Sequence, residues 1–317
     1  MIGQTNNNVI IKGIVNKIEI FEEKTKKMPA RDMIRGIIFI LVEQEYEGAR
    51  EVSEVPFKFI MCKHKVVNGK IGDQNKNWDS FYNIIKSIKS VAMADNPADA
   101  SYVTITGARV AENSYYNVRA QRLFENWDLS GNFINVGRIP DEKVDQATFQ
   151  INMMVKTTYP EVNKAEEETG RLIVEGIIGT FSGDVQKLKF VVENSKAIAA
   201  ITNSWDEQTM VKAAGRIRFT SIEVARTNQN EDSEDGFGED DIPNTYTQTR
   251  KELVITTGGL LSEEHSDYMD SDDVFKALQL RKARMDSMEL DAQSAPAPAQ
   301  ANTTGRNDSS KASLDDF

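Results

Sequence analysis

The sequence predicts a mainly β fold with two tandem five-stranded barrels, each with a helix between its third and fourth strands. Strand signals dominate the first 125 residues, and the same order of elements begins again near residue 149. A chain of 317 residues with 39% hydrophobic side chains is also long and apolar enough for two cores. A C-terminal helix over residues 271–291 and a tail over residues 292–317 complete the prediction.

The first repeat is expected over residues 9–126. Its five predicted strands are short, rich in β-branched and aromatic residues, and separated by polar loops: NVIIKGIVNKIEIF, MIRGIIFILVEQ, VPFKFIMCKHKVV, SYVTITGARVAEN and YYNVRAQRLFEN. A helix is predicted between the third and fourth strands, because apolar residues recur there at helical spacing: Trp78, Phe81, Tyr82, Ile85 and Ile88. The order is β-β-β-α-β-β.

The second repeat is expected over residues 149–260, after a connecting loop at 127–148. TFQINMMVKTTYPEVN, GRLIVEGIIGTF and VQKLKFVVEN predict three strands, SKAIAAITNSW a helix, and TMVKAAGRIRFTSIEVA the fourth strand. The fifth, TRKELVITTGG, follows an acidic loop at 228–244. RGII at 35–38 matches EGII at 175–178, an offset of 140, and TITGAR at 104–109 resembles KAAGRI at 212–217. Together with the matching element order, these similarities indicate an internal repeat.

Five strands with a helix between the third and fourth form the element order of the OB-fold, a partly open barrel that often binds oligonucleotides. Glycines inside the strands suit a small barrel, because its strands must bend sharply. A β-sandwich with similar strand spacing is the alternative.

The net charge of -11 is unevenly distributed. Residues 231–317 contain 20 Asp and Glu and 8 Lys and Arg, whereas residues 1–230 contain 29 acidic and 30 basic residues. The body is therefore nearly neutral, and a basic groove on it remains compatible with the total charge.

Catalytic and metal-binding motifs are scarce. The chain has two histidines, His64 and His265, in regions assigned to different domains, and one cysteine, Cys62. We therefore expect neither a Cys or His metal site nor a cofactor, and the phosphate-loop and nucleophile-elbow motifs are missing as well. A single cysteine, no signal-peptide pattern and apolar runs too short to span a bilayer predict a cytoplasmic protein without a membrane partner.

Single-stranded nucleic acid is held by basic side chains along a groove and by aromatic faces on which bases stack. A loop between the first two strands carries the densest basic cluster, at the position of a nucleic-acid-contacting loop in OB-folds: Lys24, Lys26, Lys27 and Arg31. Candidate stacking residues and a neighbouring cation in the first repeat and the loop after it are Tyr102, Tyr115, Arg119 and Trp127. Alternation places five further cations on the solvent faces of second-repeat strands: Lys156, Lys187, Lys189, Arg216 and Arg218. The alternatives are a solubilising role for these cations and a barrel-closing role for Trp127.

The chain ends in Leu314, Asp315, Asp316 and Phe317 after a segment rich in Ala, Pro, Ser and Asn. This ending resembles the acidic, Phe-terminated tip of bacterial and several phage single-stranded DNA-binding proteins, which join OB-folds to a flexible linker. Residues 239–243, EDDIP, look like the core of that tip without its final Phe. The resemblance implies that the tip recruits replication or recombination proteins and competes with DNA for the groove. Two barrels in one chain match the phage type better.

The expected function is sequence-tolerant binding and protection of single-stranded DNA during replication or recombination, without enzymatic activity. A phage structural or assembly protein built on OB-like barrels is one alternative. An enzyme of nucleic-acid metabolism that uses its carboxylates for Mg²⁺ is another, and strand annealing lies between binding and catalysis. The sequence leaves the oligomeric state, the site size and the choice between DNA and RNA open.

Overall fold

A computed structural model describes residues 2–294, except 47, 118–119, 143, 164 and 226–244. The first barrel closes in the order β1-β2-β3-β9-β6 and back to β1, with β3 and β9 parallel and the other pairs antiparallel. Its strands are β1 (Asn7–Lys24), β2 (Asp32–Tyr46), β3 (Ala49–Cys62), β6 (Tyr102–Glu112) and β9 (Trp127–Ser130). Helix α1 (Trp78–Ser87) lies between β3 and β6 in the chain, followed by the 3₁₀ turns η1 (Val91–Met93) and η2 (Pro97–Asp99).

The second barrel repeats this topology. It closes in the order β11-β12-β13-β15-β14 and back to β11, again with one parallel pair, β13 and β15. The strands are β11 (Gln146–Val162), β12 (Glu168–Gly179), β13 (Val185–Val192), β14 (Met210–Ala225) and β15 (Thr245–Leu260), and α2 (Ser195–Ser204) precedes β14. Five strands closed in this order with a helix before the fourth confirm the predicted tandem OB-folds.

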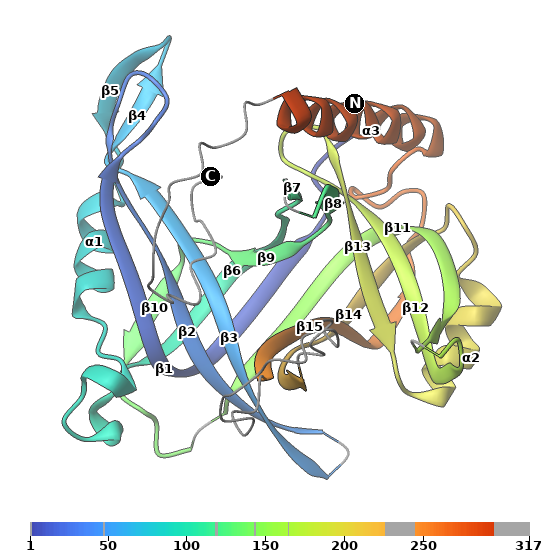
Figure 1. Cartoon of the computed structure of the whole chain (residues 1–317), viewed down its shortest axis with the longest axis horizontal. Helices are drawn as coiled ribbons and strands as arrows, with labels where there is room; N and C mark the ends of the chain where they lie inside the picture. The colour runs from blue at the N-terminus through green and yellow to red at the C-terminus, as the bar shows by residue number, and fades with distance from the viewer. Residues whose placement is uncertain are drawn as a thin grey trace, which may run out of the picture.

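The two barrels share one sheet because their first strands pair with each other. β1 and β11 run antiparallel, with Val9 opposite Phe149, two residues separated by the offset of 140 (Figure 1). Each first strand also has an irregularity at the same place, after Val15 in β1 and after Val155 in β11. An approximate twofold axis therefore passes between Val9 and Phe149.

The second strands do not keep the offset of 140. Lys17 pairs with Phe39, whereas its equivalent Thr157 pairs with Glu175, an offset of 136. The match between RGII and EGII thus does not mark equivalent positions in the two barrels. The fourth strands do follow the sequence match, because Ile11 pairs with Ile105 and Ile151 with Ala213, an offset of 108 as between TITGAR and KAAGRI.

Residues along the barrel strands alternate between buried and more exposed positions, as expected for strands with one face on the core. In β1, Val9, Ile11 and Val15 are buried, and Gly13 continues the same phase. A Cβ atom on Gly13 would lie 2.2 Å from the Leu41 carbonyl oxygen, so this close approach of β1 and β2 requires glycine. The inward residues of both barrels form one continuous hydrophobic cluster.

Short strands replace the predicted fifth strand of the first barrel. Residues 115–124 form a hairpin of β7 (Tyr115–Asn117) and β8 (Arg122–Phe124), in which the rings of Tyr115 and Phe124 stack at 5.6 Å. The closing strand is instead β9, inside the expected connecting loop, because Trp127 and Leu129 supply the alternating buried positions. β10 (Ile134–Gly137) adds to β6, and β4 (His64–Val67) and β5 (Lys70–Gln74) form a second hairpin after β3.

The C-terminal helix α3 (Ser271–Ser294) contacts β13 of the second barrel and the β7–β8 hairpin of the first (Figure 1). Val274 and Ala277 are buried against the second barrel and against Ile2. On the same face, Arg281 forms ion pairs with Glu112, at β6, and with Glu125, 3.2 Å away. The helix thereby connects the two barrels.

Candidate nucleic-acid interface

The outer face of β1, β2 and β3 is unusually apolar for a solvent-facing sheet surface. In β2 the even-numbered residues from Ile34 to Val42 are buried, so Ile37, Phe39 and Leu41 lie on the outer face, each half-buried. Phe21 on β1 and Ile60 on β3 are more open, with 39% and 46% of their surface exposed. Antiparallel sheets normally place polar residues on such a face, so this one has the composition of a binding surface.

Cations lie beside both aromatic rings of this outer face. The Lys17 ammonium is 5.4 Å from the centre of the Phe39 ring, and the Arg35 guanidinium is 5.6 Å from that of Phe21. Both cations also form ion pairs with glutamates of β1, because Lys17 lies 2.6 Å from Glu19 and Arg35 of β2 contacts Glu23. An aromatic ring beside a cation can stack a base and contact its phosphate.

The corresponding face of the second barrel is different. Phe39 pairs with Lys17, and Glu175 pairs with Thr157, the equivalent of Lys17, so Glu175 takes the position of Phe39. By the offset of 140 between the first strands, Glu161 takes the position of Phe21. Ile177, the equivalent of Leu41, is 3% exposed because it packs in the cluster that includes residues of α3. Tyr159 of β11 is also on this face, 36% exposed, and its hydroxyl donates to the Glu175 carboxylate at 3.2 Å. The second barrel therefore presents a ring beside a carboxylate, whereas the first presents two phenylalanines beside cations.

A basic lobe, which we define as residues 24–31 and 63–76, adjoins this face where β1 ends, β2 begins and β3 ends. These two segments contain eight Lys and Arg residues and one Asp. The Arg31 guanidinium donates a hydrogen bond to the His64 carbonyl oxygen at 2.9 Å, and the Lys63 N–H donates to the Asp32 carbonyl oxygen at 2.8 Å. The β1–β2 loop and the β4–β5 hairpin therefore lie side by side at one end of the barrel (Figure 1). Lys24, Lys26 and Lys27 are exposed there.

The other end of the outer face leads into a hollow between the barrels, with a volume of about 590 Å³. Leu41, Val52 and Glu54 line it from the first barrel, and Arg218 and Phe219 line it from the second. The outer face of the first barrel therefore has the basic lobe at one end and this hollow at the other.

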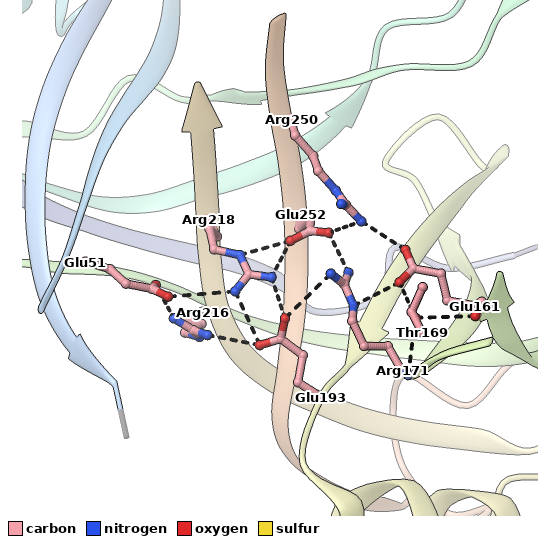
Figure 2. Close-up of polar contacts among 9 residues, drawn as sticks. All are labelled: Glu51, Glu161, Thr169, Arg171, Glu193, Arg216, Arg218, Arg250 and Glu252. Atoms are coloured by element: carbon pink, nitrogen blue, oxygen red, sulfur yellow. Dashed lines mark hydrogen bonds and ion pairs between the residues drawn. The ribbon is translucent and has the colours of Figure 1, made fainter. Parts of the chain in front are cut away.

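A network of four arginines and four glutamates borders the hollow (Figure 2). Its members are Arg171, Arg216, Arg218, Arg250, Glu51, Glu161, Glu193 and Glu252. Glu252 is central, because Arg171 and Arg250 approach its carboxylate to 2.5 and 2.8 Å and Arg218 donates to it at 2.9 Å through Nε. Burial raises the pKa of Glu252, but the hydrogen bonds from Arg171 and Arg218 outweigh this effect and the net pKa is lowered. Glu51, from β3, connects the network to the first barrel through Arg216.

The predicted solvent-facing groove of Arg216 and Arg218 is therefore wrong. Their side chains are only 8% and 17% exposed, and glutamates neutralise both. Alternation correctly placed them on the outer phase of β14. The sequence did not reveal that the first barrel and the carboxylates of neighbouring strands cover that phase.

The remaining predicted cations of the second barrel form a separate group. Lys156 and Lys189 lie 2.5 and 3.4 Å from the Glu175 carboxylate. Lys187 is half-buried and makes no ion pair within the described ranges. Burial, followed by the nearby charges of Arg281 and Lys156, lowers its pKa. The five predicted cations of the second barrel thus do not gather into one groove.

Two of the predicted stacking residues are buried. Tyr102 alternates with the inward Val103 and Ile105, as predicted, but it is only 8% exposed, because its hydroxyl donates to the Val144 carbonyl oxygen at 3.0 Å or to Asp145 at 3.1 Å and that segment covers it. Trp127 is 9% exposed and packs edge-on against Phe219 of the second barrel. Both rings are therefore part of the packed structure and unavailable to a base.

Of the remaining predicted site residues, the structure describes Tyr115 but not Arg119 or the acidic segments. Tyr115 is half-buried in the β7–β8 hairpin, where Phe124 already stacks on it. Arg119, the acidic loop 228–244 and the tip residues Leu314, Asp315, Asp316 and Phe317 lie outside the described residues.

A family model described as YorF matches residues 5–290. The chain belongs to the YorF family. No curated protein matches its sequence. Among solved structures, this YorF-family chain resembles the wild-type single-stranded DNA binding protein from Thermus aquaticus, with a TM-score of 0.48 and 5% identity over 83% of this chain and 97% of that one. A deletion mutant of that protein gives a TM-score of 0.47 and 6% identity, covering 84% and 99% of the two chains. A replication protein A heterotrimer bound to single-stranded DNA gives a TM-score of 0.20 and 12% identity, covering 68% of this chain and 45% of that one. These scores are low, and the OB-fold assignment rests on the strand order.

The aromatic outer face was missed in the sequence of this YorF-family chain, although a signal for it exists. Residues 37–42, IIFILV, form an unbroken apolar run in β2, where a strand with one solvated face would alternate. Such a run indicates that both faces are covered or that one is kept for a ligand. Among the described residues, no cluster of three or more His, Cys, Asp or Glu side chains is arranged to hold a metal ion, and no helix is long and apolar enough to cross a membrane.

Proposed function

We propose that this protein binds single-stranded DNA, with little dependence on sequence, along the outer face of its first barrel. The observation that carries the proposal is the apolar, aromatic face with Phe21 and Phe39, which begins at an almost acid-free basic lobe. Aromatic rings accept the flat face of any base, and lysines accept any phosphate, so this combination favours affinity without sequence selection.

The dimensions of the face suit a short stretch of single strand. From Met33 to Leu41, β2 extends by roughly 26 Å at about 3.3 Å per residue. OB-folds bind about 4 to 16 nucleotides. Because Lys17 and Arg35 already have carboxylate partners, most contacts to the single-strand phosphates are assigned to the exposed lysines of the β1–β2 loop, Lys24, Lys26 and Lys27.

The second barrel is proposed to act as a support. Its equivalent face carries Glu175 and Glu161 instead of phenylalanines, and its arginines are neutralised by glutamates. A polyanion would be repelled by these carboxylates or would have to break ion pairs to bind.

The proposal extends to the cellular role. A phage-type protein in the host cytoplasm, a function in replication or recombination, and recruitment of partners by Leu314–Phe317 are supported by the sequence alone. Removing those four residues should abolish partner binding and leave DNA affinity unchanged or higher. A fall in DNA affinity would contradict this role for the tip.

Fluorescence anisotropy with a labelled oligo(dT) tests the binding proposal. We expect Phe21→Ala to weaken binding by roughly 5- to 150-fold, since one base stack contributes about 1 to 3 kcal/mol. Phe181→Ala is the matched control, because Phe181 is 84% exposed but follows β12 of the second barrel. Binding should also weaken with salt, with a slope of about -0.7 per phosphate neutralised.

Two results would contradict the proposal. One is an affinity that does not change with salt, or that is the same for a blunt duplex. The other is an equal loss for Phe21→Ala and Phe181→Ala, because it would mean that the first-barrel face has no special role.

A further inference from the structure

The β4–β5 hairpin projects from the first barrel with unusual exposure. Seven consecutive residues, 65–71, are exposed, among them Val66, Val67 and Ile71 at 42%, 56% and 52%. Figure 1 shows the hairpin extending beyond the end of the barrel. The second barrel has no such element, because its third strand ends at Val192 and α2 begins at Ser195.

The hairpin is a regular two-stranded ribbon rather than an irregular loop. Asn68 and Gly69 form its turn with φ values of 49° and 73°, the positive angles that a tight two-residue hairpin turn requires. Val66 pairs with Ile71, and Val67 pairs with Lys70. Since paired residues project from the same side and successive residues alternate, aliphatic groups are exposed on both sides of the ribbon.

Such a ribbon is suited to a partner rather than to solvent. An isolated two-stranded hairpin is marginally stable in water, and exposed branched aliphatic side chains add a cost that only a contact removes. The ribbon also carries Lys65 and Lys70 and has no acidic residue between Lys63 and Gly72. Its positive charge is complementary to a polyanion and unfavourable for a basic protein surface.

The position of the ribbon indicates which polyanion it meets. Arg31 holds it against the β1–β2 loop through the His64 carbonyl oxygen, at the end of the outer face of β1, β2 and β3. A strand that leaves this face passes directly beside the ribbon. A two-stranded β-ribbon fits the major groove of a duplex, and inserted apolar side chains can separate neighbouring base pairs.

We propose that the β4–β5 ribbon contacts duplex DNA where it joins the single strand bound on the first barrel. Lys65 and Lys70 contact the duplex phosphates, and Val66, Val67 and Ile71 pack against the terminal base pairs. The protein thereby recognises a junction of single and double strand rather than a single strand alone. This inference rests on the proposed binding of single-stranded DNA.

The test compares three labelled probes with the full-length protein: oligo(dT), a blunt duplex, and the same duplex with an oligo(dT) tail on either the 5′ or the 3′ end. We expect one tailed duplex to bind at least tenfold more tightly than oligo(dT). Lys65→Gln/Lys70→Gln should remove that preference, lower the salt slope for the tailed duplex by about 1.8, and leave oligo(dT) affinity within twofold. Lys196→Gln/Lys282→Gln is the control, because it removes the same charge from exposed sites on α2 and α3.

A second variant tests the apolar contact. Val67→Ser/Ile71→Ser should retain tight binding of oligo(dT) but reduce the opening of the terminal base pair, measured with a 2-aminopurine at that position. Because all four substituted side chains are exposed, thermal unfolding of the variants should match that of the wild type.

The outcomes separate the two proposals. If oligo(dT) binds but the tailed duplex binds no more tightly, the ribbon has another partner, such as a protein, and only the junction inference is overturned. If the ribbon variants lose oligo(dT) and tailed-duplex affinity equally, the ribbon belongs to the single-strand site and the inference is again wrong. If oligo(dT) itself does not bind, the proposed function is wrong as well.

Discussion

Replacing Arg218 by Met decides whether the arginines of the second barrel stabilise the fold or bind DNA. Arg218 contacts both Glu193 and Glu252, whose side chains are 20% and 7% exposed. Methionine keeps much of the apolar stem but removes the cation that hydrogen-bonds to both carboxylates, which then keep only Arg171 and Arg216 at Glu193 and Arg171 and Arg250 at Glu252. Removing one partner from a buried ion pair costs about 3 to 5 kcal/mol, and we take the lower end because Arg218 is 17% exposed.

The expected loss is therefore about 3 kcal/mol in the free energy of unfolding, or roughly 6 °C in Tm for a chain of this size. Thermal and urea unfolding followed by circular dichroism measures it, and anisotropy with oligo(dT) below the transition measures binding. Affinity should stay within twofold of the wild type, since Arg218 is neutralised and lies on the second barrel.

Lys189→Met is the control. Lys189 is 65% exposed and 3.4 Å from Glu175, so its loss should change stability by only about 0 to 1 kcal/mol. The reasoning is refuted if Arg218→Met unfolds like the wild type but binds oligo(dT) tenfold more weakly, because the arginine would then be a DNA ligand.

Three further predictions concern acid, salt and backbone packing. The pKa of Glu252 is lowered from its usual 4.5 in the folded state. Its contribution to the free energy of unfolding is therefore complete above pH 4.5 and is lost as the pH falls through the lowered pKa. Because Glu252→Gln removes this one carboxylate, the free energy of unfolding measured with urea should decrease less steeply between about pH 5 and pH 3 in the variant than in the wild type. Lys26→Gln/Lys27→Gln should reduce the magnitude of the oligo(dT) salt slope by about 1.4, measured as affinity against salt concentration. A Cβ on Gly36 would lie 2.0 Å from a backbone oxygen of β1, whereas one on Gly137 meets nothing within 4 Å. Gly36→Ala should therefore cost at least about 1 to 3 kcal/mol in thermal unfolding, and Gly137→Ala less than about 0.5 kcal/mol.

Local patterns in the sequence were sufficient for most of the architecture. The helical spacing of Trp78, Phe81 and Ile85 predicted α1, and all three are buried. Alternation predicted the phase of β13 and β14, including the inward positions of Leu188 and Phe219. The order of elements then gave the OB-fold, because that fold is defined by its order of strands.

The functional surface was harder to predict because it depends on what covers each outward face. Arg216 meets Glu51 from a strand 165 residues away, and no local pattern reports such a partner. Trp127 was expected in a loop, but Phe219 of the other barrel buries it. Conversely, Phe39 was passed over because its neighbours are also apolar, and only the strand pairing shows that it points outward.

The pairing of Val9 with Phe149 has a consequence for how the molecule assembles. Residues 7–12 of β1 bond to β11 on one side, so a chain that ended after the first barrel would leave this edge unpaired. Unpaired edges join to copies of themselves, and the twofold relation between β1 and β11 is the geometry that two identical barrels would adopt. Carrying both barrels on one polypeptide makes this association intramolecular. The two-barrel body therefore keeps its architecture at any dilution, including the low concentrations at which separate subunits would part.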